Sequence, residues 1–146
     1  MNSLNKSIKY ALITLFSFLI LTFGYLWLIF SSPFLYNPPK NLPIIEEKNT
    51  YTVFVYGTLT KPWVRWLVMG RSGEGKPAEL LGFRKDKLNI IEDDKMITKG
   101  KLIKVNAYEL RALDRYERLG VRYDRIEVTL KDGKSAWVYK LVEPPK

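Results

Sequence analysis

Twenty consecutive residues without a charged side chain constrain this chain more than any other feature. Residues 11–30 read ALITLFSFLILTFGYLWLIF. A helix of this length rises about 1.5 Å per residue and spans the hydrocarbon core of a bilayer, which is about 30 Å thick. A cleaved signal peptide is the alternative. Its apolar region usually has about 7–15 residues and ends at small residues, whereas Ile29 and Phe30 stand here. The sequence therefore predicts a single-pass membrane anchor.

The charges that flank this segment indicate an orientation. Lys6 and Lys9 precede it closely, whereas Lys40 and Lys48 follow at a greater distance. Because lysine and arginine near a membrane span are retained on the cytoplasmic side, we expect the short basic segment of residues 1–10 in the cytoplasm. The C-terminal domain is then expected to be extracytoplasmic.

A proline-rich linker follows over residues 31–49, with prolines at 33, 38, 39 and 43. Proline fixes its own φ angle and cannot donate a backbone hydrogen bond, so the segment resists helix and sheet and favours an extended chain. We expect a stiff tether that holds the domain off the bilayer.

Residues 50–146 are expected to form one domain of the α+β class, a small, mixed, partly closed β-barrel flanked by two short helices. The first helix should follow an N-cap at Thr60 and end at Gly70, and an acidic turn should occupy residues 92–95. Runs of β-branched and aromatic residues predict the strands, and Asp132-Gly133 marks a hairpin turn. The predicted strands are residues 51–56, 78–91, 96–105, 122–130 and 135–142, and the predicted helices are residues 62–69 and 107–117.

Composition excludes several kinds of chemistry. The chain has no cysteine and no histidine, so disulfides, thiol nucleophiles, serine–histidine triads and histidine-bound metals are excluded. Acid–base chemistry must come from Asp, Glu, Lys or Tyr. The net charge is +9, with lysines and arginines scattered along the chain. This pattern fits a solvated surface near anionic lipid, or an adaptor on such a surface, and no nucleic-acid partner is expected.

Residues 106–117, NAYELRALDRYE, predict an amphipathic helix with a carboxylate on its apolar face. Leu110, Leu113 and Glu117 share that face, because they are spaced three, four and seven residues apart. Asp114 also points inward, and we expect it to be structural and hydrogen-bonded to backbone N–H groups. Burial raises the pKa of such a carboxyl group, which suits a general acid or base near neutral pH. The alternative is that the helix ends early and Glu117 turns to solvent.

The stretch FVYGTL, residues 54–59, combines the end of a strand with a glycine. Gly57 allows a close turn, after which the N–H groups of Thr58 and Leu59 can face a cavity. Free N–H groups at such a turn favour a carboxylate or a carbonyl oxygen. An ordinary turn after a core strand is the alternative.

These two segments stand in an ordered set of motifs: VFVYGTL, PAELLGFRK, TKGKLIKV, AYELRALDRYE, and RYDRIEV followed by AWVY. Over residues 51–141 the set resembles the gamma-glutamylcyclotransferase-like family, especially its short bacterial and plant members. The resemblance implies a barrel-like fold with a central cavity and assigns the catalytic acid/base to Glu117. It also implies that the backbone of Tyr56, Gly57, Thr58 and Leu59 grips a small γ-glutamyl substrate.

In the implied reaction the α-amine of a γ-glutamyl group attacks its own γ-carbonyl and releases 5-oxoproline, so no cofactor or metal is expected. Tyr123 and Arg125 match a Y-x-R element of the family and are expected to bind the substrate. Arg125 either holds a substrate carboxylate or pairs with Glu127 or Asp114. The sequence does not indicate an oligomeric state.

Two departures keep an alternative function open. Many relatives carry a Tyr-Pro element that residues 88–100 lack, and familiar members have no membrane anchor. A non-catalytic module that binds a ligand or a partner on the same fold is therefore the alternative to an enzyme.

Overall fold

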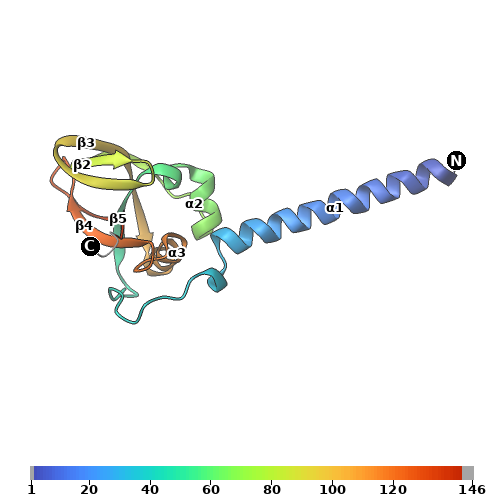
Figure 1. Ribbon diagram of the computed structural model, residues 1–146, viewed down its shortest axis with the longest axis horizontal. Helices are drawn as coiled ribbons and strands as arrows, with labels where there is room; N and C mark the ends of the chain where they lie inside the picture. Colours follow the sequence, from blue (N-terminus) through green and yellow to red (C-terminus); the bar gives the residue numbers. More distant parts are fainter. Residues whose placement is uncertain (1, 143–146) are drawn as a thin grey trace.

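The computed structural model describes residues 2–142 and consists of a curled five-stranded sheet, short helices packed beside it and one long N-terminal helix (Figure 1). Two 3-10 turns, η1 and η2, complete the element set. In chain order the elements are α1 (Asn2–Phe30), η1 (Pro33–Leu35), β1 (Thr50–Val55), η2 (Gly57–Thr60), α2 (Pro62–Met69), β2 (Lys76–Asp86), β3 (Asn89–Asn106), α3 (Ala107–Glu117), β4 (Tyr123–Thr129) and β5 (Ser135–Leu141).

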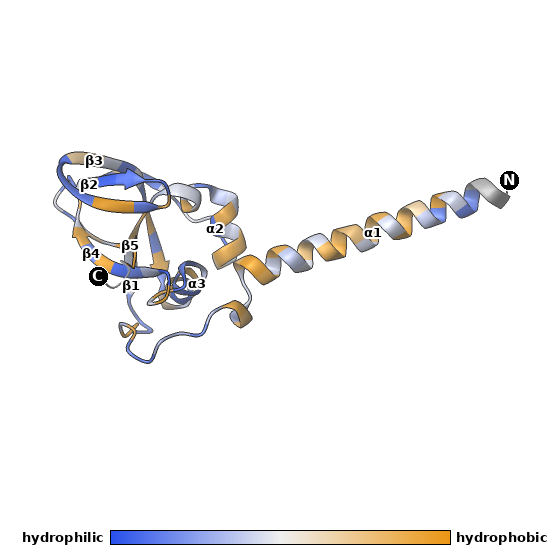
Figure 2. Ribbon diagram, viewed as in Figure 1, coloured by the Kyte–Doolittle hydropathy of each residue, from blue (hydrophilic) through white to orange (hydrophobic). Residues whose placement is uncertain are grey.

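Helix α1 projects away from the domain, and hydrophobic residues predominate along much of its length (Figures 1 and 2). Its segment Asn5–Phe30 is long and apolar enough to cross a membrane, judged by length and composition. Helix α1 includes residues 2–10 of the predicted basic segment, so this part is continuous with the apolar stretch, and residue 1 lies outside the described residues.

The linker, residues 31–49, lies along the domain and contacts it (Figure 1). Its expected role as a tether that holds the domain off the bilayer stays a prediction. The hydroxyl of Tyr36 donates to the carbonyl oxygen of Leu119 at 2.7 Å. Leu42 and Ile45 pack against the core. The proline pattern shows that this segment resists regular structure, but it does not show which side chains dock on a neighbouring surface.

The sheet has the strand order β2-β3-β1-β5-β4, and neighbouring strands are antiparallel except for the parallel pair β1 and β5. The two longest strands curl, so that the sheet forms half of a barrel beside α2 and α3 (Figure 1). The α+β class and the mixed, partly closed barrel predicted from the sequence are confirmed.

The turn between β2 and β3 lies at Lys87–Leu88 and not at the predicted residues 92–95. Lys87 adopts a left-handed φ of 53°, and the flanking residues Asp86 and Asn89 pair across a tight turn. The acidic segment is instead part of an irregularity in β3, where the register shifts beside Gly82. The misplacement arises because aspartate is typical of turns, whereas these residues lie in a largely exposed, irregular part of β3.

The second half of β1, residues 53–55, is buried on both faces, which explains its apolar run VFV. Val53 and Val55 contribute to the cluster that includes α2 and α3, whereas Phe54 belongs to a cluster on the other side with Leu80 and Val138. The side chains alternate because successive residues of a strand point to opposite faces.

Gly100 of β3 fits closely against β1. A Cβ atom added there would lie 2.5 Å from both the ring of Phe54 and the carbonyl oxygen of Val55. Real side chains do not tolerate such contacts, so the glycine permits β3 and the Phe54 side chain to approach each other.

Candidate functional site

The 3-10 turn η2 follows the end of β1, the central strand of the sheet. Gly57 has a φ of +69°, in the left-handed region that glycine adopts without strain. The Thr60 hydroxyl donates to the Gly57 carbonyl oxygen at 2.6 Å and stabilises the turn. Thr60 therefore lies within η2, and the N-cap of α2 is Lys61, one residue later than predicted. The first N–H groups of a helical turn have no carbonyl partner within the turn, so they are available to a ligand.

A buried arginine that the sequence analysis did not identify holds this turn in place. Arg65 of α2 is only 2% exposed, and its Nη1 donates to the carbonyl oxygens of Leu59 and Thr60 at 2.8 and 2.9 Å. Its Nε donates to the carbonyl oxygen of Ser72 at 2.5 Å. Burial lowers the pKa of the guanidinium group. The burial of Arg65 could have been predicted from its helical spacing, which places it on the same apolar stripe as Val68.

Helix α3 carries the second half of the site and begins with a capping box. The Asn106 side chain accepts from the Glu109 N–H, and the Glu109 carboxylate accepts from the Asn106 N–H, each at 2.9 Å. Glu109 is further held by an ion pair with Arg71. Leu110 and Leu113 are fully buried, as their spacing predicts. This fixed start and buried stripe set the rotational position of every later residue on α3.

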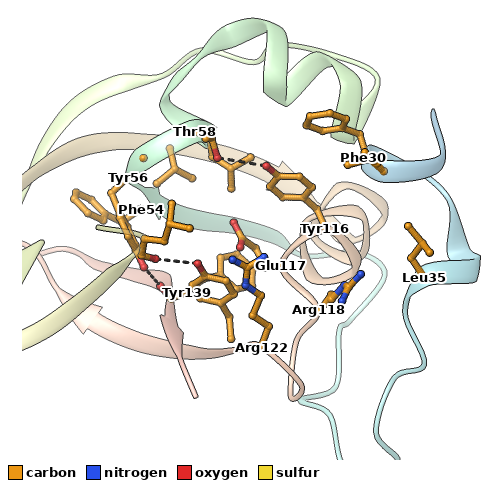
Figure 3. A pocket seen from close by; sticks show the side chains of 16 residues that line it. Phe30, Leu35, Phe54, Tyr56, Thr58, Tyr116, Glu117, Arg118, Arg122 and Tyr139 are labelled. Atoms are coloured by element: carbon orange, nitrogen blue, oxygen red, sulfur yellow. Dashed lines mark hydrogen bonds between the residues drawn. The ribbon is translucent and has the colours of Figure 1, made fainter. Parts of the chain in front are cut away.

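Glu117 is the last residue of α3 and is partly buried. Its side chain points into a cavity and not into bulk solvent (Figure 3). Burial raises the pKa of the Glu117 carboxyl group to about 7, and the Arg122 guanidinium opposes that rise. The carboxyl group is therefore able to exchange a proton near neutral pH.

Asp114 also points inward, but it is saturated by side chains and not by the backbone N–H groups that we expected. The Nη1 of Arg125 donates to both carboxylate oxygens at 3.0 and 3.1 Å, and the Tyr139 hydroxyl donates at 2.5 Å. Arg125 is buried and lies 5.3 Å from the centre of the Trp137 ring. Of the two arrangements predicted for Arg125, the structure has an ion pair, with Asp114.

A cavity of about 390 Å³ separates the η2 turn from the end of α3. Its volume lies within the range of about 300–1,000 Å³ that is typical of small-molecule sites. Figure 3 shows Glu117 between Tyr56 and Tyr139 on one side and Phe30 and Leu35 on the other. The cavity is lined by Ile29, Phe30, Leu35, Phe54, Val55, Tyr56, Gly57, Thr58, Leu59, Leu88, Tyr116, Glu117, Arg118, Arg122, Tyr123 and Tyr139.

The structure brings most of the predicted site residues to this one cavity. Its lining includes Glu117, Tyr123 and the whole turn from Tyr56 to Leu59, but Arg125 is not among the lining residues. The Tyr123 hydroxyl donates to the carbonyl oxygen of Leu88 at 2.9 Å and so fixes the tip of the β2–β3 hairpin at the rim. These positions are compatible with the predicted roles, which remain predictions.

Two arginines that we did not single out from the sequence also line the cavity. Arg118 and Arg122 are exposed and come from the connection between α3 and β4. The Arg122 guanidinium lies 5.5 Å from the centre of the Tyr123 ring. The sequence alone does not distinguish them from the many other surface cations, because only the tertiary structure brings them to the cavity.

The family profile described as gamma-glutamyl cyclotransferase, AIG2-like matches residues 53–146. The fold and the cavity agree with that match, so the chain belongs to the gamma-glutamyl cyclotransferase, AIG2-like family. AIG2-like protein C of Arabidopsis thaliana is 34% identical over an alignment of 98 residues, and the match covers 61% of this chain and 56% of that protein. The chain thus spans little more than half the length of this curated relative.

Solved structures share the fold. The solution structure of an Arabidopsis thaliana protein is 27% identical and has a TM-score of 0.57, with 68% of this chain and 67% of that chain covered. A structure named gamma-glutamyl cyclotransferase is 16% identical and has a TM-score of 0.52, with 64% and 68% covered. An uncharacterised protein from Homo sapiens is 21% identical and has a TM-score of 0.55, with 67% and 69% covered. The last two likenesses concern the fold alone.

Proposed function

We propose that this protein is a gamma-glutamylcyclotransferase-like enzyme that releases 5-oxoproline from a γ-glutamyl amide or peptide, with Glu117 as its acid/base. The supporting observation is that Glu117 faces the η2 turn across a cavity (Figure 3). Within residues 2–142, no hydrogen bond or ion pair to the Glu117 side chain is found. Its raised pKa fits a group that must both accept and return a proton.

The reaction is intramolecular, so the protein must mainly fold the substrate and move one proton. The α-amine nitrogen forms a bond to the γ-carbonyl carbon, and the bond from that carbon to the leaving nitrogen breaks. Glu117 takes a proton from the attacking amine and delivers it to the leaving amine. Holding the two reacting groups in contact lowers the entropic barrier.

The N–H groups of the η2 turn are suited to the negative charge that develops on the γ-carbonyl oxygen. Donors that are already in position cost no reorganisation when the charge appears. Arg65 supports this role because it holds the turn through the carbonyl oxygens of Leu59 and Thr60.

We assign the substrate carboxylate to Arg122 in preference to Arg125. The Arg125 guanidinium is already bound to Asp114, whereas Arg122 lines the cavity close enough to Glu117 to affect its pKa. A carboxylate ligand at Arg122 would also reduce the influence of that cation on Glu117.

We further propose that α1 anchors the enzyme in a membrane, because it is long and apolar enough to span one. The lysine distribution supports an extracytoplasmic C-terminal domain, where the enzyme would meet γ-glutamyl compounds outside the cytoplasm. A reporter fused to the C-terminus that is active in only one compartment tests this orientation.

The test of catalysis uses the full chain in detergent micelles with a panel of γ-glutamyl amides, and it measures 5-oxoproline. We expect Glu117→Gln to lower kcat/KM by about 100- to 10,000-fold, the usual effect of losing a general acid/base. The matched control is Glu127→Gln, which changes an exposed glutamate on β4 and should leave the rate unchanged.

A pH profile sharpens this test. Because ionised Glu117 is the proton acceptor, kcat/KM of the wild type should rise as the pH increases through about 7. A folded wild-type protein that releases no 5-oxoproline would support the non-catalytic module. Equal activity in wild type and Glu117→Gln would contradict the assigned role of Glu117.

A further inference from the structure

The end of α1 and the turn that follows it form one wall of the cavity. Ile29 and Phe30 of α1 and Leu35 of η1 line it, and Phe30 and Leu35 lie on the opposite side of Glu117 from Tyr56 (Figure 3). These three side chains are apolar, and they come from a segment that lies outside residues 53–146, which match the family profile. We call Ile29, Phe30 and Leu35 the anchor wall.

Specific contacts hold the anchor wall against the domain on both sides of the cavity. The Ser31 hydroxyl donates to the carbonyl oxygen of Leu67 in α2 at 2.7 Å. On the other side, Tyr36 donates to the carbonyl oxygen of Leu119, just after α3. The Ser32 hydroxyl accepts from the Phe34 N–H at 3.1 Å and fixes the start of η1.

The anchor wall also contacts Tyr116, the residue that precedes Glu117. The Phe30 ring stacks on the Tyr116 ring, with centroids 5.6 Å apart and an angle of 11° between the planes. Tyr116 precedes Glu117, and its hydroxyl lies 3.3 Å from the Thr58 hydroxyl in the η2 turn. Phe30 therefore packs against the side chain that connects the two halves of the site.

The cavity has more room than the glutamyl group requires. A γ-glutamyl group has about nine non-hydrogen atoms, and even at the roughly 30 Å³ that each water molecule occupies in the liquid it would fill about 270 Å³. The cavity volume is about 390 Å³. The remaining space must accommodate the substituent on the leaving nitrogen, which has to pass close to Glu117 to receive its proton.

We propose that the anchor wall binds the leaving-group side of the substrate, so that the preferred substrates are γ-glutamyl amides of apolar amines. This inference rests on the proposed function for the identity of the glutamyl end. The η2 turn and Arg122 offer polar partners to the glutamyl end, whereas the anchor wall offers only hydrocarbon and an aromatic ring. An alkyl or aromatic substituent there removes apolar surface from water on both partners.

The experiment compares two γ-glutamyl amides that differ only in the amine, n-hexylamine against ethanolamine, with the full chain in detergent micelles. Both kcat/KM for 5-oxoproline release and the dissociation constant for the Glu117→Gln variant are measured. We expect the hexylamide to be favoured by about tenfold or more in each quantity, because even one methylene in an apolar pocket is worth about tenfold.

Two variants of the same turn then locate the preference. Leu35→Asp places a carboxylate on the anchor wall and should reduce the hexylamide preference to near unity. Phe34→Asp is the matched control, because Phe34 is the neighbouring apolar residue, is 78% exposed and does not line the cavity. It should leave the preference unchanged, and it also corrects for partition of the hexyl chain into detergent.

The outcomes separate this inference from the proposed function. No release of 5-oxoproline, together with a hexylamide preference in binding that Leu35→Asp abolishes, would refute catalysis and support the anchor wall. Release of 5-oxoproline with equal values for both amides would support catalysis and overturn the anchor wall. If Leu35→Asp leaves the hexylamide preference intact, the anchor-wall proposal is overturned as well. A folded protein that binds neither amide overturns both proposals.

Discussion

Asp114 and Glu117 lie three residues apart on α3, and burial raises the pKa of both carboxyl groups. Their surroundings differ. Asp114 accepts hydrogen bonds from Arg125 and Tyr139, whose contacts oppose the effect of burial. Glu117 faces open volume, with Arg122 as the cation that opposes its raised pKa. A raised pKa is therefore not sufficient to identify a catalytic carboxylate; the distinguishing feature is whether partners already occupy its oxygens.

Of the substitutions at these two carboxyl groups and their partners, Asp114→Asn is expected to change the stability of the protein most. The substitution leaves the Arg125 guanidinium buried without a counter-charge, which should cost about 3–5 kcal/mol of unfolding free energy. Urea unfolding of the full chain in detergent, followed by circular dichroism, measures this cost. Asp124→Asn changes an exposed neighbour on β4 and should have little effect. Equal midpoints for the two variants would mean that the ion pair is not structural.

Replacing Glu117 is expected to raise the stability of the fold, whereas Asp114→Asn lowers it, and the size of the gain depends on pH. The folded-state pKa is about 7 against the usual 4.5, so the native state holds a proton that the unfolded state has lost between these pH values. The stability of the wild type should therefore fall as the pH rises from about 4.5 to 7.

Glu117→Gln removes this titration. The variant should match the wild type below about pH 4.5 and exceed it by on the order of 3 kcal/mol above pH 7. Urea midpoints measured across that range provide the check. Parallel pH profiles for the two proteins would show that Glu117 is solvated and would undermine its proposed role.

The smallest of these effects is expected from Tyr139→Phe, which removes one of the hydrogen bonds to Asp114 but keeps the aromatic ring. Loss of a hydrogen bond to a charged group should cost about 1.5 kcal/mol, because Arg125 still satisfies the carboxylate. Tyr108→Phe, at a position that is 70% exposed, is the control for loss of a tyrosine hydroxyl. A cost as large as that of Asp114→Asn would show that Tyr139, and not Arg125, dominates the pair.

Local patterns predicted α3 well. The spacing of Leu110 and Leu113 predicted which face is buried, and Glu117 was expected on that face, although an early end of the helix was the open alternative. The partners of Asp114 did not follow from the sequence, because Arg125 and Tyr139 come from β4 and β5 and meet it only when the sheet has formed.

Local sequence patterns also did not predict where the linker, residues 31–49, packs on the domain. Tyr36 docks on Leu119, 83 residues later, and Leu42 lies against Gly120, where an added Cβ would be 3.1 Å from the leucine side chain. Proline spacing describes the stiffness of a chain but not the surface on which it rests. For the same reason the contribution of Phe30 and Leu35 to the cavity was not predictable from an apolar helix and a linker considered separately.

The close fit at Gly100 shows that the size of the cavity depends on residues that the ligand never touches. Phe54 lines the cavity from β1, and Gly100 of β3 packs directly behind its ring. A side chain at that position would displace the ring and so alter the volume open to a ligand, although Gly100 itself makes no contact with the cavity. The shape of the cavity therefore depends on residues at the back of the sheet as well as on those at the mouth of the pocket.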